Sequence, residues 1–206
     1  MQNPWEKIPL TDYENHMKLD SVMQLQAMNE MMKEQFNAYP VSDVMILEIA
    51  GSNGLAHISK DKFRKIYGVD VNSDYLNEVV RRYPDLNGIL DCLHINLIDE
   101  THKLPKTDMV IANLLIEYIG YECFQKAIQQ ANPDYVSCMI QINMEGNWVS
   151  DSPYLYIFDG LEQVHHQMEE HTLKGKMLEI NYQAIKTLEY ILPNGKKLMQ
   201  IDFKKF

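Results

Sequence analysis

Residues 44–50 constrain the fold of this 206-residue chain more than any other segment. The run is short, mostly apolar and partly β-branched, and it ends at Gly51. Such a run is typical of a strand buried on both faces, in a parallel sheet with helices on either side. Four of the five residues at 50–54 are small, so the backbone can turn tightly after the strand. Because ligands of open α/β sheets bind at the carboxyl ends of strands, this turn marks a predicted ligand site.

Strand-like and helix-like segments alternate along the rest of the chain. Further strands are predicted at 65–71, 87–94, 108–113 and 134–142, and helices at 12–37, 55–62, 121–130, 154–171 and from Asn72 or Ser73 to Arg82. Near the carboxyl terminus, 187–192 and 197–203 flank Asn194-Gly195, a pair typical of hairpin turns. The pattern predicts an α/β fold with a doubly wound, mostly parallel sheet and a C-terminal antiparallel hairpin. We divide it into an N-terminal arm and helix that cover the cleft, residues 1–40, and a main domain, residues 41–206.

Composition and charge narrow the function classes. The chain has 29 acidic and 19 basic residues, a net charge of −10, which repels the phosphate backbone of nucleic acids. No apolar run reaches the roughly 18 residues that span a bilayer. The first ten residues lack a signal-peptide pattern, and the three cysteines lack CxxC spacing. We therefore expect a cytoplasmic protein that acts on a small molecule, binds neither nucleic acid nor membrane, and is a monomer or homodimer.

The turn after the first strand discriminates between ligands. It holds Gly51 and Gly54 but lacks the Gly-x-Gly-x-x-Gly pattern that accommodates a dinucleotide pyrophosphate. Glu48 lies near the end of the strand, where a buried carboxylate needs a cation or hydrogen-bond donors. Asp70 ends the second strand 22 residues later, where an acid can bind a ribose. The two acids predict a nucleoside that carries an amino acid; alternatively, each acid caps the helix that follows it.

Four segments of the chain together resemble a known family. Residues 47–54, Gly68-Val69-Asp70, Asn96-Leu97 and 110–118 are similar to the successive motifs of class I S-adenosylmethionine-dependent methyltransferases. The similarity runs from about residue 41 to 142, half of the chain. It implies a seven-stranded Rossmann-like sheet, S-adenosyl-L-methionine as cofactor, and methyl transfer to an unidentified acceptor. Residues 13–17 and 149–154 resemble a bacterial subgroup whose substrate is not settled.

The resemblance also implies a set of cofactor-binding residues. Glu48 orients the methionine amino group, residues 50–54 surround the methionine part, Asp70 holds the ribose, and Val71 packs on adenine. Ala50 and Ser52 stand where the family usually has glycine, and Asn96 where it usually has aspartate, which bears on affinity. The implied cofactor-binding residues are Glu48, Ala50, Gly51, Ser52, Gly54, Asp70, Val71, Asn96, Leu97 and Asn113.

Four further residues are candidates for binding the substrate. Tyr13 and His16 share one helix face, and Glu117 and Tyr118 follow the fourth strand, where acceptors sit in this fold. Alternatively, Tyr13 belongs to the core, His16 to the surface, and Glu117-Tyr118 to the start of a helix. Since a sulfonium methyl group is already activated, the sequence assigns no catalytic residue.

Other readings of the sequence are open. His165, His166 and His171 with neighbouring glutamates could bind a metal, but a solvated helix explains them, and we predict no metal site. A module that senses the cofactor or docks a partner without catalysis is one alternative function. A nicotinamide-dependent oxidoreductase is another, although the missing glycine and the terminal hairpin argue against it.

Overall fold

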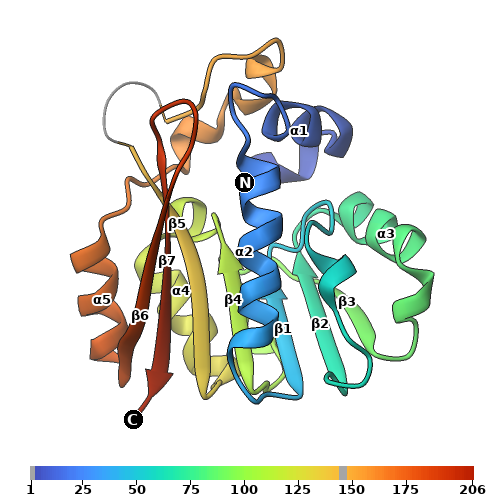
Figure 1. Ribbon diagram of the computed structural model, residues 1–206, viewed down its shortest axis with the longest axis vertical. Helices are drawn as coiled ribbons and strands as arrows, with labels where there is room; N and C mark the ends of the chain where they lie inside the picture. Colours follow the sequence, from blue (N-terminus) through green and yellow to red (C-terminus); the bar gives the residue numbers. More distant parts are fainter. Residues whose placement is uncertain (1–2, 144–147) are drawn as a thin grey trace.

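The computed structural model describes residues 3–143 and 148–206, so residues 1–2 of the predicted arm lie outside it. A seven-stranded sheet of order β3-β2-β1-β4-β5-β7-β6 forms the centre (Figure 1). The first five strands pair in parallel, and the last two are antiparallel. The predicted fold class is confirmed. The strands are β1 (Asp43–Leu47), β2 (Lys65–Asp70), β3 (Leu90–His94), β4 (Met109–Asn113), β5 (Tyr135–Ile142), β6 (Tyr182–Ile191) and β7 (Lys197–Lys205).

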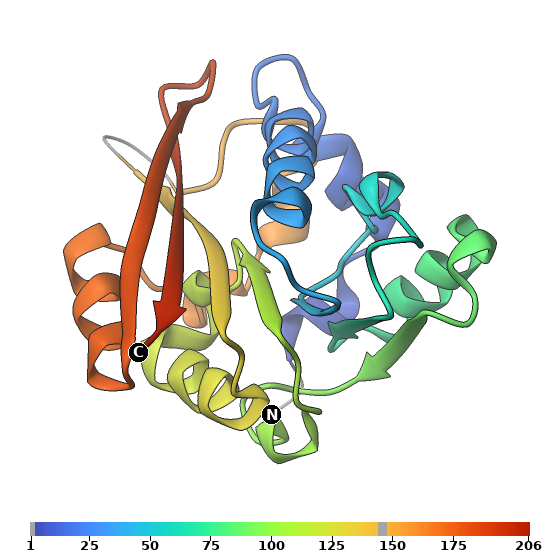
Figure 2. The same ribbon diagram turned by 60° about the horizontal axis from the view of Figure 1, so that its bottom comes forward.

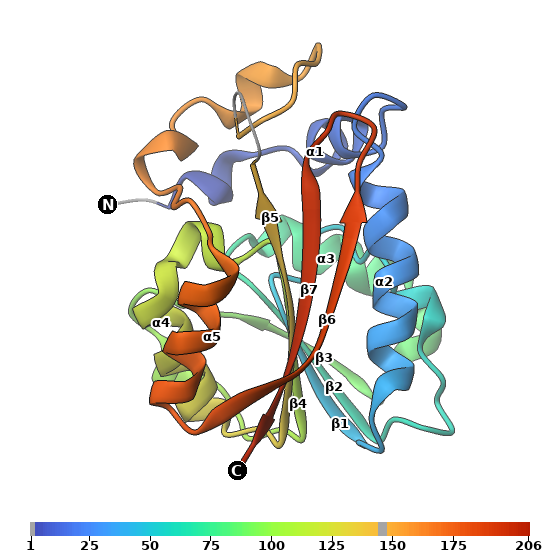
Figure 3. The ribbon, with the colours of Figure 1, turned by 60° about the vertical axis from the view of Figure 1, so that its left-hand side comes forward.

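Helices cover both faces of the sheet (Figures 2 and 3). One face carries α2 (Gln24–Ala38) and α3 (Ser73–Arg82), and the other carries α4 (Ile116–Ala131) and α5 (Glu170–Glu179). Alternate residues of β1 point to opposite faces: Ile46 packs in the cluster of Phe36 from α2, and Met45 in the cluster of Phe124 from α4. This two-sided burial explains the nearly continuous apolar strands of the sequence.

The predicted helix over 12–37 is wrong as a single element. The structure has α1 (Leu10–Met17) and then α2, with residues 18–23 as a turn between them. The Leu19 carbonyl accepts the N–H groups of Val22 and Met23, and Met23 takes a left-handed conformation with φ of 53°. A residue in that region cannot continue a right-handed helix, so α2 starts afresh after it.

The predicted helix over 55–62 is also wrong. Only a 3-10 turn, Leu55–His57, follows β1. On this face of the sheet, α2 takes the place of the missing helix, because its Met32 and Phe36 pack in one cluster with Leu55 and Phe63. A helix from the preceding segment thus buries the apolar surface that the crossover leaves uncovered.

The predicted helix over 154–171 does not form either. The structure has two 3-10 turns, Leu155–Phe158 and Leu161–Gln163, and α5 begins only at Glu170. Gly160 between the turns has a φ of 90°, which breaks the helical path. This segment and the N-terminal residues lie over the carboxyl ends of the parallel strands (Figure 1). Among the described residues, no helix is both long enough and apolar enough to cross a bilayer.

Candidate functional site

A cavity of about 960 Å³ opens at the carboxyl ends of β1, β2 and β3. Its floor includes five of the residues predicted to bind the cofactor. Its other walls come from most of residues 3–9, including Trp5 and Lys7, and from part of 156–164. The predicted residues in the floor are Glu48, Asp70, Val71, Asn96 and Leu97.

Two polar atoms on residues of this cavity lack partners. Oε2 of Glu48 and Nε1 of Trp5 are buried and have no hydrogen bond within the part of the chain that the structure describes. Burial, reinforced by the nearby carboxyls of Asp70 and Glu117, raises the pKa of Glu48 well above its usual range. Because buried polar groups are nearly always hydrogen-bonded, an orphan acceptor and an orphan donor on residues that line one cavity point to a polar ligand.

Asp70 connects the turn after β1 to the end of β2. Its carboxylate accepts the backbone N–H of Ala50 at 2.9 Å and that of Asn72 at 2.8 Å. Burial nevertheless raises its pKa to about 6. The helix α3 is capped by Asn72, whose side chain accepts the N–H groups of Asp74 and Tyr75, so Asp70 is not the cap. Asp70 thus stabilises the turn while it lines the cavity.

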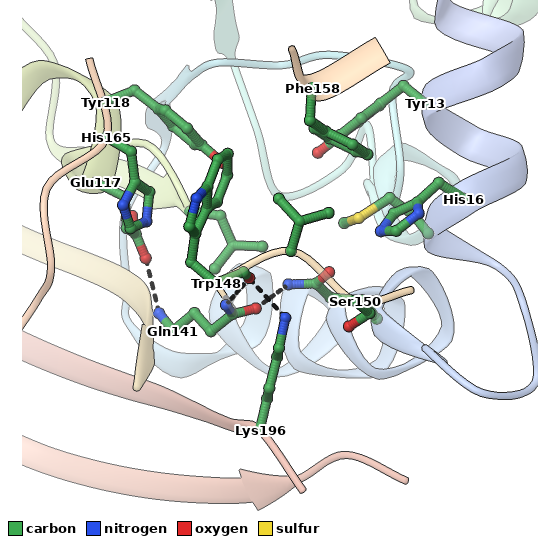
Figure 4. Close-up of a pocket in the computed structure, with 14 residues that line it drawn as sticks. Tyr13, His16, Glu117, Tyr118, Gln141, Trp148, Ser150, Phe158, His165 and Lys196 are labelled. Carbon is green, nitrogen blue, oxygen red and sulfur yellow. Dashed lines mark hydrogen bonds between the residues drawn. The ribbon is translucent and has the colours of Figure 1, made fainter. Parts of the chain in front are cut away.

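A second, smaller cavity of about 40 Å³ is drawn in Figure 4. It brings together all four residues predicted to bind the substrate: Tyr13, His16, Glu117 and Tyr118. Tyr118 lines both cavities. Trp5 packs edge-on against Tyr13 and Tyr118, with ring centroids 5.6 and 4.8 Å away. These three aromatic rings therefore lie between the two cavities.

Glu117 is the acidic residue that lines the second cavity. It lies in the first turn of α4 and is 4% exposed. Its Oε1 accepts the backbone N–H of Gln141 at 2.7 Å, whereas its Oε2 has no partner among residues 3–143 and 148–206. Burial raises its pKa to about 7, so that near neutral pH it can both hold and release a proton.

The chain is similar to known proteins in structure but not in sequence. No family model matches the chain, and no curated protein matches it. Solved structures do match. The N-methyltransferase NodS from Bradyrhizobium japonicum, in complex with S-adenosyl-L-homocysteine, is 9% identical, with 99% of each chain covered and a TM-score of 0.66.

Two more solved structures show the same likeness. Geranyl diphosphate C-methyltransferase from Streptomyces coelicolor is 10% identical over 88% of this chain and 77% of that one, with a TM-score of 0.65. Magnesium protoporphyrin IX methyltransferase from Synechocystis, with bound S-adenosylmethionine, is 10% identical over 93% and 83%, with a TM-score of 0.59. The chain has the fold of the class I methyltransferases. At such low identity the likeness establishes the fold and leaves the activity to be argued from the site.

Within this methyltransferase fold, the turn after β1 is covered by the chain itself. Ala50, Gly51 and Asn113 line a third cavity of about 40 Å³ next to Glu48, and neither Ser52 nor Gly54 lines any of the three cavities. A Cβ atom at Gly51 would collide with Glu14 of α1, and one at Gly54 would lie 2.7 Å from Met32 Cβ. These glycines therefore let the turn pack closely under α1 and α2.

Asn113 and Asn96 already have partners within the protein. Asn113 exchanges two hydrogen bonds of 2.9 Å with Gln35 of α2. The side-chain carbonyl of Asn96 accepts the N–H of Ile98 at 3.1 Å and keeps a second lone pair. Cofactor contacts of both residues stay predictions.

His16 is buried rather than on the surface. Its Nδ1 is hydrogen-bonded to Ser152 Oγ at 2.7 Å. Burial and the nearby Lys196 lower its pKa to about 4, so the ring is neutral at pH 7. The interpretation of His16 as a surface residue is therefore wrong.

Several residues of the second cavity were not singled out as binding residues from the sequence. Lys196 follows the hairpin turn, Gln141 lies one residue before the end of β5, and Trp148 and Phe158 come from the segment after β5. His165, considered above for a metal, stacks on Trp148 with centroids 4.2 Å apart. No three His, Cys, Asp or Glu side chains gather as a metal site in the described ranges. The one sequence signal for any of these residues is the Asn-Gly turn, which predicts that Lys196 lies at the hairpin tip.

Proposed function

We propose that the protein transfers a methyl group from S-adenosyl-L-methionine to a small acceptor. The observation that carries this proposal is the pair of unpartnered polar atoms, Glu48 Oε2 and Trp5 Nε1, on residues that line a cavity of about 960 Å³ at the carboxyl edge of the sheet. Glu48 accepts from the amino group of the cofactor, Asp70 faces its ribose, and Val71 packs on its adenine. When bound, the cofactor supplies an activated methyl group.

The charges of the large cavity favour a cationic ligand over a diphosphate. Four acidic residues line it: Glu48, Asp70, Asp99 and Asp159. Among the described residues, Lys7 is the only lysine or arginine that lines it. The N–H of Ala50, which a phosphate would need, is already bonded to Asp70. This arrangement supports a sulfonium cofactor and disfavours a nicotinamide dinucleotide.

The second cavity is the place for the acceptor in this proposal. Tyr118 lines both cavities, so an acceptor there would lie next to the cofactor. We further propose that residues 1–40 cover the cleft as a separate unit and that the protein works in a bacterial cytoplasm as a monomer or homodimer. The net charge of −10 supports a small molecule over a nucleic acid as acceptor.

Thermal unfolding with two ligands tests the cofactor assignment. At a hundred times its Kd, S-adenosyl-L-homocysteine should raise the Tm by about 5–10 °C, because ligand that binds only the folded state stabilises it by about 2.7 kcal/mol. The substitution E48Q should reduce this rise, and NAD should give none. A rise in Tm with NAD alone, or no rise with either ligand, would contradict the proposal. Binding of the cofactor without methyl transfer to any acceptor would favour a non-catalytic module.

A further inference from the structure

The second cavity contains a carboxylate with spare hydrogen-bonding capacity. Oε2 of Glu117 is buried without a partner in the described part of the chain, while Oε1 is held by the N–H of Gln141. An unpaired buried oxygen lowers the stability of the folded protein, and a hydrogen-bond donor that reaches Oε2 would remove this cost. Figure 4 shows Glu117 at one side of the space that the cavity residues enclose.

A buried lysine contributes the opposite charge. Lys196 is 7% exposed, and its Nζ donates to the Trp148 carbonyl at 2.6 Å. An ammonium group has three donors, and no other partner of this one is found among the described residues. Burial lowers its pKa to about 8, so it is still mostly charged at neutral pH.

These two charges do not neutralise each other. No ion pair joins Glu117 and Lys196 within residues 3–143 and 148–206, and both side chains line the same cavity. The two imidazoles that line the cavity are neutral near pH 7, because burial lowers the pKa of both His16 and His165. The cavity thus presents one negative and one positive group, each with unused hydrogen-bonding capacity.

Aromatic rings complete the walls. Tyr13, Tyr118, Trp148 and Phe158 also line the cavity (Figure 4). The faces of such rings attract ammonium groups, which adds to the attraction of the Glu117 carboxylate. The site therefore favours an amine at the Glu117 side more than a neutral hydroxyl.

We propose that the second cavity binds a small zwitterionic acceptor, with its amine on Glu117 and its anionic group on Lys196. This inference rests on the proposed methyl transfer and names the substrate class for it. The cavity of about 40 Å³ holds a few water molecules, so the spacer between the two groups is short.

Glu117 has a defined chemical role in this proposal. An ammonium group has no lone pair, so one N–H bond must break, with its electron pair kept on nitrogen and its proton taken by Glu117 Oε2. The nitrogen lone pair then forms the bond to the methyl carbon, and the carbon–sulfur bond of the methyl donor breaks with its pair left on sulfur. Charge balances, because the donor loses its positive charge on sulfur while Glu117 loses its negative charge on protonation, and the product is again an ammonium.

Calorimetry with S-adenosyl-L-homocysteine present tests the substrate class. The probes are glycine, β-alanine and 4-aminobutyrate, each compared with the alkylamine and the carboxylate that lack one of its two groups. At least one zwitterion should bind ten-fold or more tightly than both of its controls. The variants E117Q and K196M should each weaken it by ten-fold or more, since each removes a charge-assisted hydrogen bond.

The two variants should also fail differently. K196M should still bind the alkylamine, and E117Q should still bind the carboxylate, whereas the exposed control variants E122Q and K60M should behave as the parent protein. The probe comparison on the unmodified protein decides the matter even if a variant does not fold. Normal cofactor-product binding without any preference for a zwitterion overturns this inference and leaves the proposed function intact. Failure to bind the cofactor product overturns both.

Discussion

Four buried side-chain atoms have no hydrogen-bond partner in the described part of the protein, and three belong to residues of the two ligand cavities. They are Trp5 Nε1, Glu48 Oε2 and Glu117 Oε2; the fourth, Gln200 Oε1, lies on β7. Each such atom costs about 1–3 kcal/mol of stability, which a structural role alone does not explain. Their gathering at one edge of the sheet favours a binding site there.

The pH dependence of stability should reveal Glu117. Its folded-state pKa of about 7 exceeds its ordinary value of 4.5, so its carboxyl contributes stability below pH 4.5 that is lost as the pH rises through 7. The variant E117Q lacks this loss. Relative to the parent protein it should gain up to roughly 3 kcal/mol in the free energy of unfolding between pH 4.5 and 8. Urea unfolding at several pH values measures this, with E122Q as control, and a constant difference would contradict it.

Replacing Asp70 should affect both binding and stability. The variant D70A loses the two backbone hydrogen bonds that hold the turn and the carboxylate that faces the cavity. Affinity for S-adenosyl-L-homocysteine should fall by about 1–3 kcal/mol, and the Tm should fall as well. Calorimetry on the folded variant checks this, with the exposed Asp74→Ala as control. Unchanged affinity would remove Asp70 from the site.

At the scale of elements, the strands are easier to predict from the sequence than the helices. Residues 44–50 and 134–142 are identifiable because burial on both faces leaves few polar residues in them. The helices over 12–37 and 154–171 were mispredicted because the apolar spacing continues through turns. Those turns depend on one backbone angle, at Met23 and at Gly160, which periodicity does not encode.

The same distinction applies to the site. Glu48 and Asp70 were predictable because each lies where a strand ends, and strand ends share one edge of a parallel sheet. Lys196, Trp148 and His165 come from loops and a hairpin tip, whose positions depend on how distant segments pack. Apart from the Asn-Gly turn before Lys196, no local pattern marks such residues.

A pair of glycines tests the kink in α4. Gly120 has φ of 72° and ψ of 166° inside α4, which strains any other residue, whereas Gly175 of α5 is exposed and has open space around it. The variant G120A should lose about 1–3 kcal/mol of stability. The matched G175A should gain about 0.5–1 kcal/mol, because alanine favours the helix. Denaturant unfolding of both measures this, and equal effects would contradict the assigned kink.

At the scale of the whole molecule, the N-terminal segment lines the large cavity and is tied to α3. The Asn72 side chain donates to the Trp5 carbonyl at 3.0 Å, and the Tyr75 hydroxyl donates to the Ile8 carbonyl at 2.9 Å. Glu14 of α1 also forms an ion pair with Arg82 of α3. A cofactor that enters past this segment must wait for these contacts to open.

Weakening one of these contacts should accelerate exchange of the cofactor. The variant Y75F removes the hydrogen bond to Ile8, worth about 1 kcal/mol, so association and dissociation of S-adenosyl-L-homocysteine should each become several-fold faster. Stopped-flow measurements report both rates, and Y83F on the far end of α3 serves as control. Unchanged rates would show that the ligand enters elsewhere.

The chain contains two tryptophans, and one lines each ligand cavity: Trp5 the larger and Trp148 the smaller. Each of these two cavities therefore has one intrinsic fluorophore among its lining residues. The variant W5F retains only Trp148, and W148F retains only Trp5. Changes in the fluorescence emission of each variant would then show in which order ligands fill the two cavities.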